Sequence, residues 1–234
     1  MSESEDALLA SALAAVRERI ERACDRAGRD PASVAIVAAS KTVPVERLGA
    51  AAAAGLTRFG ENRVQEAEAK VEALPNVEWH LIGHLQANKA ARAVALFSVI
   101  QSVDSLELAA RLDRVAGEAR TAPLPVLLQV NVDADPAKSG FGPADLGRSL
   151  DALSDLHHLE LRGLMTVGLM VPTPEEARPT FAQLAQLSAR LRDRTTGLGA
   201  DLSMGMTDDF EVAIEEGATI VRVGRAIFGE RPGH

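Results

Sequence analysis

The sequence contains no tyrosine, one tryptophan and one cysteine among its 234 residues. Because Cys24 stands alone, neither an intrachain disulfide nor a cysteine zinc cluster can form. No apolar run approaches the roughly 20 residues that a helix needs to cross a bilayer, and the opening MSESEDALLA lacks the basic and apolar parts of a signal peptide. We therefore expect a cytoplasmic protein.

Basic charge is also scarce, since 25 Lys and Arg face 33 Asp and Glu and the net charge is −8. This argues against nonspecific binding to nucleic acid or to an anionic membrane, which needs a basic face, but it leaves room for a local basic pocket. The hydrophobic fraction of 47% and the charged fraction of 25% are typical of a soluble globular protein. With only six Phe, its core must be mainly aliphatic.

The hydrophobic pattern predicts one helix followed by an alternation of strands and helices. Apolar residues recur at steps of four and three over residues 5–28, which indicates an amphipathic helix. Strands are then expected at 34–40, 57–61, 78–84, 98–103, 125–131, 161–167, 201–205 and 219–223. Helices are expected at 44–54, 62–73, 87–95, 105–119, 143–155, 174–194 and 208–216.

This alternation implies parallel strands joined by right-handed crossovers. Eight such units fit a (β/α)8 (TIM) barrel near the small end of its size range. An open doubly wound sheet is the alternative, and it is less favoured because no GxGxxG follows the first strand. No linker is visible, so we expect one domain over 1–234, with an N-terminal helix at 1–28 and the barrel at 34–229.

In such barrels the chemistry lies at the carboxyl ends of the strands. The candidates at these positions are Lys41, Asn62, His84, Gln86, Ser105, Asn131, Met165, Thr166, residues 203–206 and residues 222–225.

Lys41 ends the first strand in VAIVAASKTVP and precedes a helix that Pro44 can open. A cation near a helix N-terminus is disfavoured, and partial burial disfavours it further. Both effects favour the neutral amine, which is the form that condenses with an aldehyde or ketone. The alternative, favoured by this stretch alone, is a surface lysine that extends into solvent.

The last two strands carry a possible phosphate site. Ser203 ends the seventh strand, Thr207 can cap a helix that begins at Asp208, and the eighth strand ends in RVGRAIFG, in which Gly224 permits a close backbone approach. The loops after strands seven and eight are the usual phosphate site of this barrel. The alternative is that these glycines only permit tight turns. A reactive lysine on the neighbouring first strand favours a phosphorylated carbonyl compound as ligand.

Other polar residues are open to two interpretations each. Arg222, which is always charged, either faces a ligand or pairs with an acidic neighbour inside the barrel. His84 either contacts a ligand or only packs, and Lys89 and Lys138 are either solvated or help to attract an anion. His80 and His84 share a strand without an adjacent carboxylate triad, so we expect no metal site.

Taken together, these stretches resemble the pyridoxal phosphate homeostasis proteins, a family of proteins that bind pyridoxal 5′-phosphate (PLP). The resemblance covers nearly the whole chain and rests on AASKTVP (38–44), FGENRVQEAEAK (59–70), WHLIGHLQANK (79–89), QSVDS (101–105), QVNVDADPAKSGF (129–141), GLMTVG (163–168), LSMGMTDDFEVAIEEG (202–217) and VRVGRAIFG (221–229).

The resemblance implies a barrel like the N-terminal domain of alanine racemase, with PLP held as a Schiff base on Lys41. It also implies that Ser203, Gly224 and Arg225 hold the phosphate and that Arg222 lies near the pyridine nitrogen, where its charge would oppose protonation. Further residues that match the family's pocket lining are Asn62, Ile82, Met165 and Met204.

The sequence departs from the family at two positions. Arg225 stands where Thr or Ser is frequent, so a hydroxyl contact to the phosphate is lost, and His84 stands where proline is common. The guanidinium of Arg225 would then either pair with the phosphate or point away.

Family members are thought to store PLP or hand it to apo enzymes, and so to balance vitamin B6 pools, without an established reaction. We therefore expect a non-catalytic, monomeric carrier. The alternative is a PLP-dependent racemase, but alanine racemases use a tyrosine as second base, and this sequence has none; His84 would have to replace it. A lysine-dependent aldolase is a third, less favoured alternative.

Overall fold

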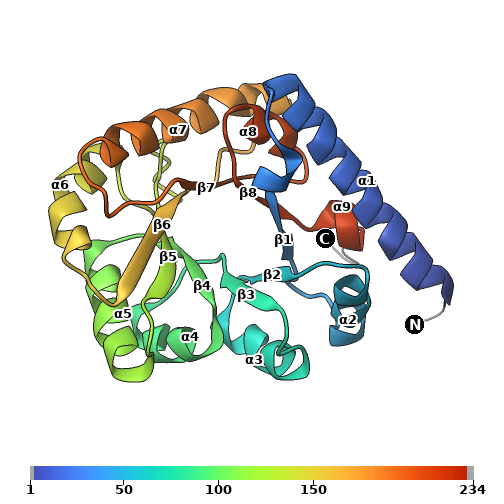
Figure 1. Ribbon diagram of the computed structural model, residues 1–234, viewed down its shortest axis with the longest axis horizontal. Helices are drawn as coiled ribbons and strands as arrows, with labels where there is room; N and C mark the ends of the chain where they lie inside the picture. Colours follow the sequence, from blue (N-terminus) through green and yellow to red (C-terminus); the bar gives the residue numbers. More distant parts are fainter. Residues whose placement is uncertain (1–2, 231–234) are drawn as a thin grey trace.

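In the computed structural model, which describes residues 3–230, eight parallel strands close into a barrel in sequence order (Figure 1). The strands are β1 Ala35–Ala39, β2 Arg58–Glu61, β3 Glu78–Leu81, β4 Val99–Val103, β5 Leu124–Gln129, β6 Leu159–Met165, β7 Asp201–Met206 and β8 Ile220–Val223. The ring closes where β1 pairs with β8. The predicted (β/α)8 barrel is confirmed, and the open-sheet alternative is wrong.

The helices form an outer ring around the strands (Figure 1). They are α1 Glu3–Ala27, α2 Val45–Ala53, α3 Val64–Ala73, α4 Ala90–Leu96, α5 Leu106–Ala119, α6 Pro143–Ser154, α7 Arg178–Arg192, α8 Phe210–Glu215 and α9 Arg225–Phe228. Short 3-10 turns occur at η1 Pro31–Ser33, η2 Ala87–Lys89 and η3 Pro174–Ala177.

Two hydrophobic clusters fill the two sides of the sheet. Val37, Met165 and Ile220 belong to a small cluster inside the barrel. Ala38 and Met204 belong to a much larger cluster between the strands and the helices. Because strand side chains alternate between the two faces, this division shows which apolar residues of β1, β4, β5, β6 and β8 point into the barrel.

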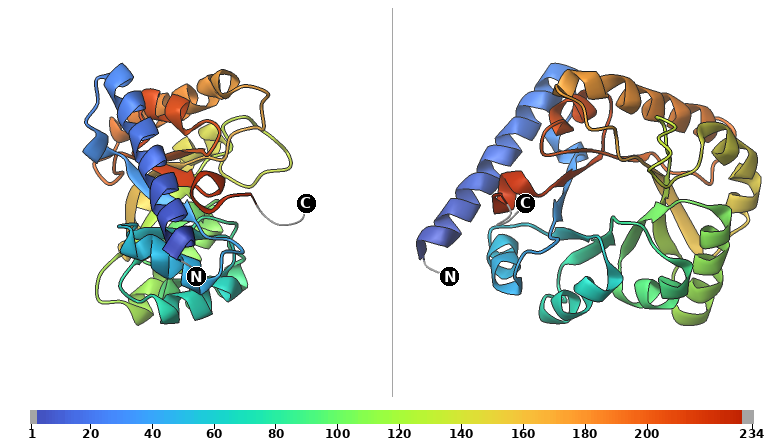
Figure 2. Two further views of the ribbon diagram at one scale, coloured as in Figure 1. Left: turned by 90° about the vertical axis from the view of Figure 1, so that its right-hand side faces the viewer. Right: turned by 180° about the vertical axis from the view of Figure 1, so that it is seen from behind.

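The long helix α1 lies across the outside of the barrel, next to α8 and α9 (Figure 2). Its apolar stripe, which includes Leu13, Val16 and Ile20, is buried in the outer cluster. The helix that follows β8, α9, has only four residues. The N-terminal helix therefore covers the wall near β8 that a longer last helix would otherwise cover.

The turn before α8 differs from the prediction. The helix begins at Phe210, so Thr207 does not cap it, and Asp209 occupies the N-cap position. The Asp209 carboxylate instead accepts a hydrogen bond of 2.6 Å from the backbone N–H of Met206. The buried Asp209 carboxylate thus accepts the hydrogen bond of the Met206 amide, and the helix begins two residues later than predicted.

Candidate functional site

Lys41 and Gly224 lie side by side at the carboxyl ends of β1 and β8. The two strands pair in register, with Ala38 opposite Val223. Both residues line one cavity of about 230 Å³, together with Arg225. A Cβ atom on Gly224 would lie 3.3 Å from the carbonyl oxygen of Ala39, so glycine keeps the two backbones close. The structure therefore brings together the lysine and the glycine loop predicted from the sequence.

Lys41 is held in a tight turn. The N–H of Val43 donates to the carbonyl of Ser40 at 2.9 Å, and Thr42 has a φ of 64°. A positive φ is rare for a β-branched residue and costs of the order of 1 kcal/mol or more, so it persists only where surrounding contacts enforce it. The half-buried Lys41 side chain is thus attached to a backbone fixed on both sides.

A buried ion pair supports this turn from below. Lys70 donates to the carbonyl of Ser40 at 2.8 Å and to Glu61 at 2.5 Å. The Ser40 hydroxyl donates to the same Glu61 oxygen at 2.7 Å. Because burial makes an unpaired charge costly, these bonds fix the backbone that precedes Lys41. The sequence analysis missed this pair, although both residues lie in the FGENRVQEAEAK segment.

Arg222 is a buried cation in the barrel interior. Its guanidinium donates to the Ser203 hydroxyl at 2.7 Å and to the carbonyl of Thr166 at 2.7 Å. Burial lowers the pKa of Arg222 to about 10, an effect that the negative charge of Asp209 opposes. The guanidinium is therefore still charged at neutral pH. Within residues 3–230 no carboxylate lies close enough to form an ion pair with it, so its bonding partners are neutral.

The hydrogen bonds continue from Ser203 through the barrel interior. The Ser203 hydroxyl donates to the Gln101 carbonyl oxygen at 2.6 Å, and the Gln101 amide nitrogen lies 2.7 Å from Nδ1 of His80. Nε2 of His80 lies 3.1 Å from Glu78, which also accepts from Arg58 at 3.1 Å. We refer to these residues, with Arg222, as the interior chain; its bonds cross the barrel to the amino ends of β2 and β3.

The direction of these hydrogen bonds determines which ring nitrogen of His80 carries the proton. An arginine only donates hydrogen bonds. The Ser203 hydroxyl therefore accepts a hydrogen bond from Arg222 and donates its own to Gln101. The Gln101 amide then donates to Nδ1 of His80, and Nε2 carries the ring proton toward Glu78. The hydrogen bond from His80 lowers the pKa of Glu78 to about 2; burial opposes this shift, and the positive charge of Arg58 adds to it.

A second, larger cavity opens on the other side of Lys41. It has a volume of about 700 Å³ and is lined by Lys41, Asn62, His84 and Lys89, among others. Nδ1 of His84 is 2.8 Å from a carboxylate oxygen of Asp104. We refer to it as the β2–β3 cavity, because its lining comes from the loops that follow these strands.

The remaining predicted residues take different places. Ile82 packs against the interior cluster, which contains Met165, whereas the Met204 side chain points outward into the helix layer. Arg225 forms ion pairs with Asp208 and, at 3.6 Å, with Glu230. The guanidinium of Arg225 therefore points toward acidic neighbours, one of the two alternatives left open by the sequence.

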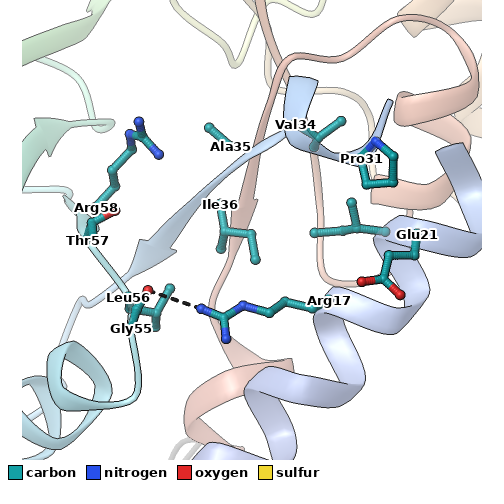
Figure 3. Close-up of a pocket in the computed structure, with 11 residues that line it drawn as sticks. Arg17, Glu21, Pro31, Val34, Ala35, Ile36, Gly55, Leu56, Thr57 and Arg58 are labelled. Carbon is teal, nitrogen blue, oxygen red and sulfur yellow. Dashed lines mark hydrogen bonds between the residues drawn. The ribbon is translucent and has the colours of Figure 1, made fainter. Parts of the chain in front are cut away.

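A third cavity lies at the opposite end of the barrel, between α1 and the amino ends of β1 and β2 (Figure 3). Its volume is about 250 Å³, and Arg17 donates to the carbonyl of Gly55 across it at 3.1 Å. It is lined by none of the predicted site residues. Over residues 3–230 no helix is long and apolar enough to span a membrane, and no cluster of three potential metal ligands is found.

Comparison with known families and proteins gives consistent matches. The family described as "Alanine racemase, N-terminal domain" matches residues 11–232. The pyridoxal phosphate homeostasis protein of Pseudomonas aeruginosa is 46% identical over 228 residues, which cover 95% of this chain and 96% of the relative. The corresponding protein of Aquifex aeolicus is 42% identical and covers 94% of this chain and 96% of the relative.

Solved structures agree with these matches. PipY of Synechococcus elongatus, solved with PLP bound, is 42% identical, with a TM-score of 0.84 over 94% of this chain and 100% of that chain. An alanine racemase of Clostridium difficile aligns with a TM-score of 0.75 at 14% identity, over 97% of this chain and 57% of the enzyme. At such low identity, the racemase supports only the shared barrel fold.

Proposed function

Because this chain belongs to the pyridoxal phosphate homeostasis protein family, we propose that it binds PLP at the carboxyl end of the barrel and takes part in balancing the PLP pool. The observation that carries this proposal is the placement of Lys41 beside Gly224, above the buried Arg222.

The residues at this end of the barrel fit the cofactor. A cation without an acidic partner within residues 3–230, Arg222, faces the interior, and a side chain at Gly224 would be crowded by Ala39. No hydrogen bond or ion pair engages Nζ of Lys41 within the same residues. When bound, PLP supplies an aldehyde carbon that bonds covalently to amines and an aromatic ring that withdraws electrons.

We assign the binding roles as follows. Lys41 holds the aldehyde carbon through Nζ. Gly224 and Arg225 hold the phosphate through backbone N–H groups at the start of α9, because the first amides of a helix have no partner within it. The Ser203 hydroxyl already bonds Arg222 and Gln101, so we infer that Ser203 acts mainly by positioning Arg222, while a direct phosphate contact stays a prediction.

The ring would lie over the barrel mouth, near Asn62, Ile82 and Met165. Met204 packs away from the interior, so only its backbone could contribute. Arg222 would face the pyridine nitrogen with a fixed positive charge and donate a hydrogen bond to it, which leaves that nitrogen unprotonated. An unprotonated pyridine is a weak electron sink, which favours holding the cofactor over carbanion chemistry.

We further propose that the chain is a single-domain, monomeric, cytoplasmic carrier rather than an enzyme, and that it stores PLP or delivers it to apo enzymes. Its relatives are named for homeostasis rather than for a reaction. An assay with a PLP-dependent apo enzyme as acceptor separates delivery from storage. Racemisation of alanine at rates typical of enzymes, about 1 per second or more, would contradict the carrier role.

The central prediction concerns Lys41. Lys41→Ala should remove the visible absorbance of the lysine-linked cofactor after incubation with PLP, because no other amine takes its place beside Gly224. Lys138→Ala is the matched control, since Lys138 lies at the same end but is bonded to the carbonyls of Val167 and Gly168, and it should keep the absorbance. A wild-type protein that stays colourless with added PLP would contradict the proposed function.

A further inference from the structure

The β2–β3 cavity holds polar groups that the binding of PLP does not use. Within residues 3–230, Nζ of Lys89 makes no hydrogen bond or ion pair, like Nζ of Lys41 in the same cavity. Within the same residues, the side-chain amide of Gln86, which also lines the cavity, forms no hydrogen bond. Its volume of about 700 Å³ lies in the usual range for small-molecule sites, roughly 300–1,000 Å³. The free donors indicate a polar ligand.

The charge of this cavity indicates an anion. Among its lining residues within 3–230, the one carboxylate is Glu66, which is paired with Arg63 at 3.1 Å. Glu68, whose charge is felt by Lys89, lies outside the lining and is paired with Arg92. The charges of Lys41 and Lys89 are therefore not compensated by the lining. This occurs in a chain whose net charge is −8. A half-buried ammonium group is screened less by salt than an exposed one. An anionic group entering here would therefore be held mainly by Lys89, because Lys41 is engaged by the cofactor.

His84 adds a group that can take up a proton. Asp104 accepts the hydrogen bond from Nδ1, so in the neutral ring Nε2 is free to accept a proton. Ser139 also approaches Nδ1, at 3.4 Å. His84 lines the cavity together with Lys41. The cavity thus combines a cation, a proton acceptor and the amine that holds the cofactor.

We propose that the β2–β3 cavity is a second binding site, which takes a small α-amino acid beside the cofactor. Lys89 holds the carboxylate, and the amino group displaces Lys41. The bond from the cofactor carbon to Nζ of Lys41 breaks, and a bond to the amino-acid nitrogen forms. A proton passes from the incoming amine through Nε2 of His84 to Nζ of Lys41. No oxidant or reductant is needed, and the cofactor leaves attached to the amino acid.

This inference rests on the proposed function, and it assigns a release step to it. Only a ligand with both an anionic group and a primary amine uses the lysine cation and the adjacent reactive carbon together. A free phosphate or a simple carboxylate would bind without exchanging. An amine without a carboxylate would exchange without using Lys89.

The first experiment uses the PLP-loaded protein, in which the cofactor engages Lys41. Propionate, which has the carboxylate but no amine, is titrated while backbone amide NMR signals are followed. We expect saturable shifts at His84, Gln86 and Lys89, which Lys89→Met should abolish. Arg114→Met is the matched control, because it removes one positive charge outside the cavity, from the exposed pair of Arg114 with Glu118; it should keep the shifts.

The second experiment uses the PLP-loaded protein and follows loss of the lysine-linked absorbance after addition of L-alanine. The rate should saturate with L-alanine, and Lys89→Met should raise the half-saturating concentration about tenfold, the factor that corresponds to about 1.4 kcal/mol. Arg114→Met should leave the half-saturating concentration unchanged, and Lys89→Arg should return it close to the wild-type value. With ethylamine, which lacks the carboxylate, the wild type and Lys89→Met should release the cofactor equally fast.

His84→Asn should lower the maximal rate with L-alanine without changing the half-saturating concentration, because it affects proton transfer rather than binding. Equal half-saturating concentrations in the wild type and Lys89→Met would overturn the inference, as would a rate that rises linearly with L-alanine. A wild type that fails to load with PLP would instead contradict the proposed function, so the two failures are distinguishable.

Discussion

At the scale of single residues, the interior chain predicts the tautomer of His80. Since Gln101 donates to Nδ1 and Glu78 accepts from Nε2, the ring should be protonated at Nε2 only. Ring ¹⁵N chemical shifts at neutral pH measure this directly. The exposed His157 serves as an internal reference and should show averaged tautomers. A proton on Nδ1 of His80 would contradict the bond directions given above.

Gln101→Leu tests whether this chain positions Arg222. The variant leaves the Ser203 hydroxyl without its acceptor, and an unsatisfied buried polar group costs about 1–3 kcal/mol. We expect lower thermal stability and, in the PLP-loaded protein, a shifted cofactor fluorescence maximum, because Arg222 loses its fixed partner. Gln101→Glu, which keeps an acceptor oxygen, should recover the fluorescence. An unchanged fluorescence maximum in Gln101→Leu would contradict the idea that the interior chain positions Arg222.

The sequence identifies Lys41 and Gly224 because both follow apolar strands, and a closed barrel must bring the ends of its first and last strands together. It does not identify the partners of Arg222. Those partners depend on which strand residues face inward and on the register between β4, β7 and β8, where β7 and β8 shift register between Ser203 and Met206. The outward orientation of Met204 escapes sequence reasoning for the same reason.

At the scale of elements, α1 is a structural part of the barrel wall. Leu13 is 1% exposed and Leu8, on the same helix, is 70% exposed. Leu13→Ala should lower the free energy of unfolding by about 2–5 kcal/mol, whereas Leu8→Ala should change it by less than about 0.5 kcal/mol. Urea titration followed by circular dichroism measures both. Equal, small effects would mean that α1 packs only loosely on α8 and α9.

Polar contacts fix where α1 lies along the barrel. Arg19 donates to Glu211 at 3.0 and 2.7 Å and stacks over Phe210 at 4.3 Å, and Arg26 donates to Glu215 at 2.7 Å. The sequence predicts the existence of α1 from its apolar period, and of α8 as a helix. It does not predict that they meet, because their contact joins residues almost 200 positions apart in the sequence, as |i−j| is 192 for Arg19 and Glu211.

At the scale of the whole molecule, the ends of the barrel differ in role. The carboxyl end carries both cavities that Lys41 lines, while pairs of arginine and carboxylate, such as Arg19 with Glu211, join helices on the outside of the barrel. The closed barrel follows from the eightfold alternation in the sequence. The pairing of these charges follows only from three-dimensional placement, because the sequence shows only a net charge of −8.

These paired carboxylates predict how stability depends on pH. The hydrogen bond from His80 lowers the pKa of Glu78 to about 2 from an ordinary 4.5, and hydrogen bonds from Arg19 and Arg178 lower the pKa values of Glu211 and Glu215. A carboxyl group with a lowered folded-state pKa stabilises the fold fully above its unfolded value. That stability is lost as pH falls from about 4.5 toward 2. Burial raises the pKa of Asp209, which works in the opposite direction but for one group only.

We therefore expect the melting temperature to be nearly constant from pH 7 to 5.5 and to fall below about pH 4.5, where the unfolded chain takes up protons first. Glu211→Gln should lower the melting temperature at pH 7 and reduce the difference between pH 7 and pH 3, because its ion pair with Arg19 is already lost. Glu118→Gln is the control, since its pair with Arg114 is exposed and such pairs contribute little. Differential scanning calorimetry across this range measures the effect, and a melting temperature that rises toward pH 3 would show that relief of Asp209 dominates over the three glutamates.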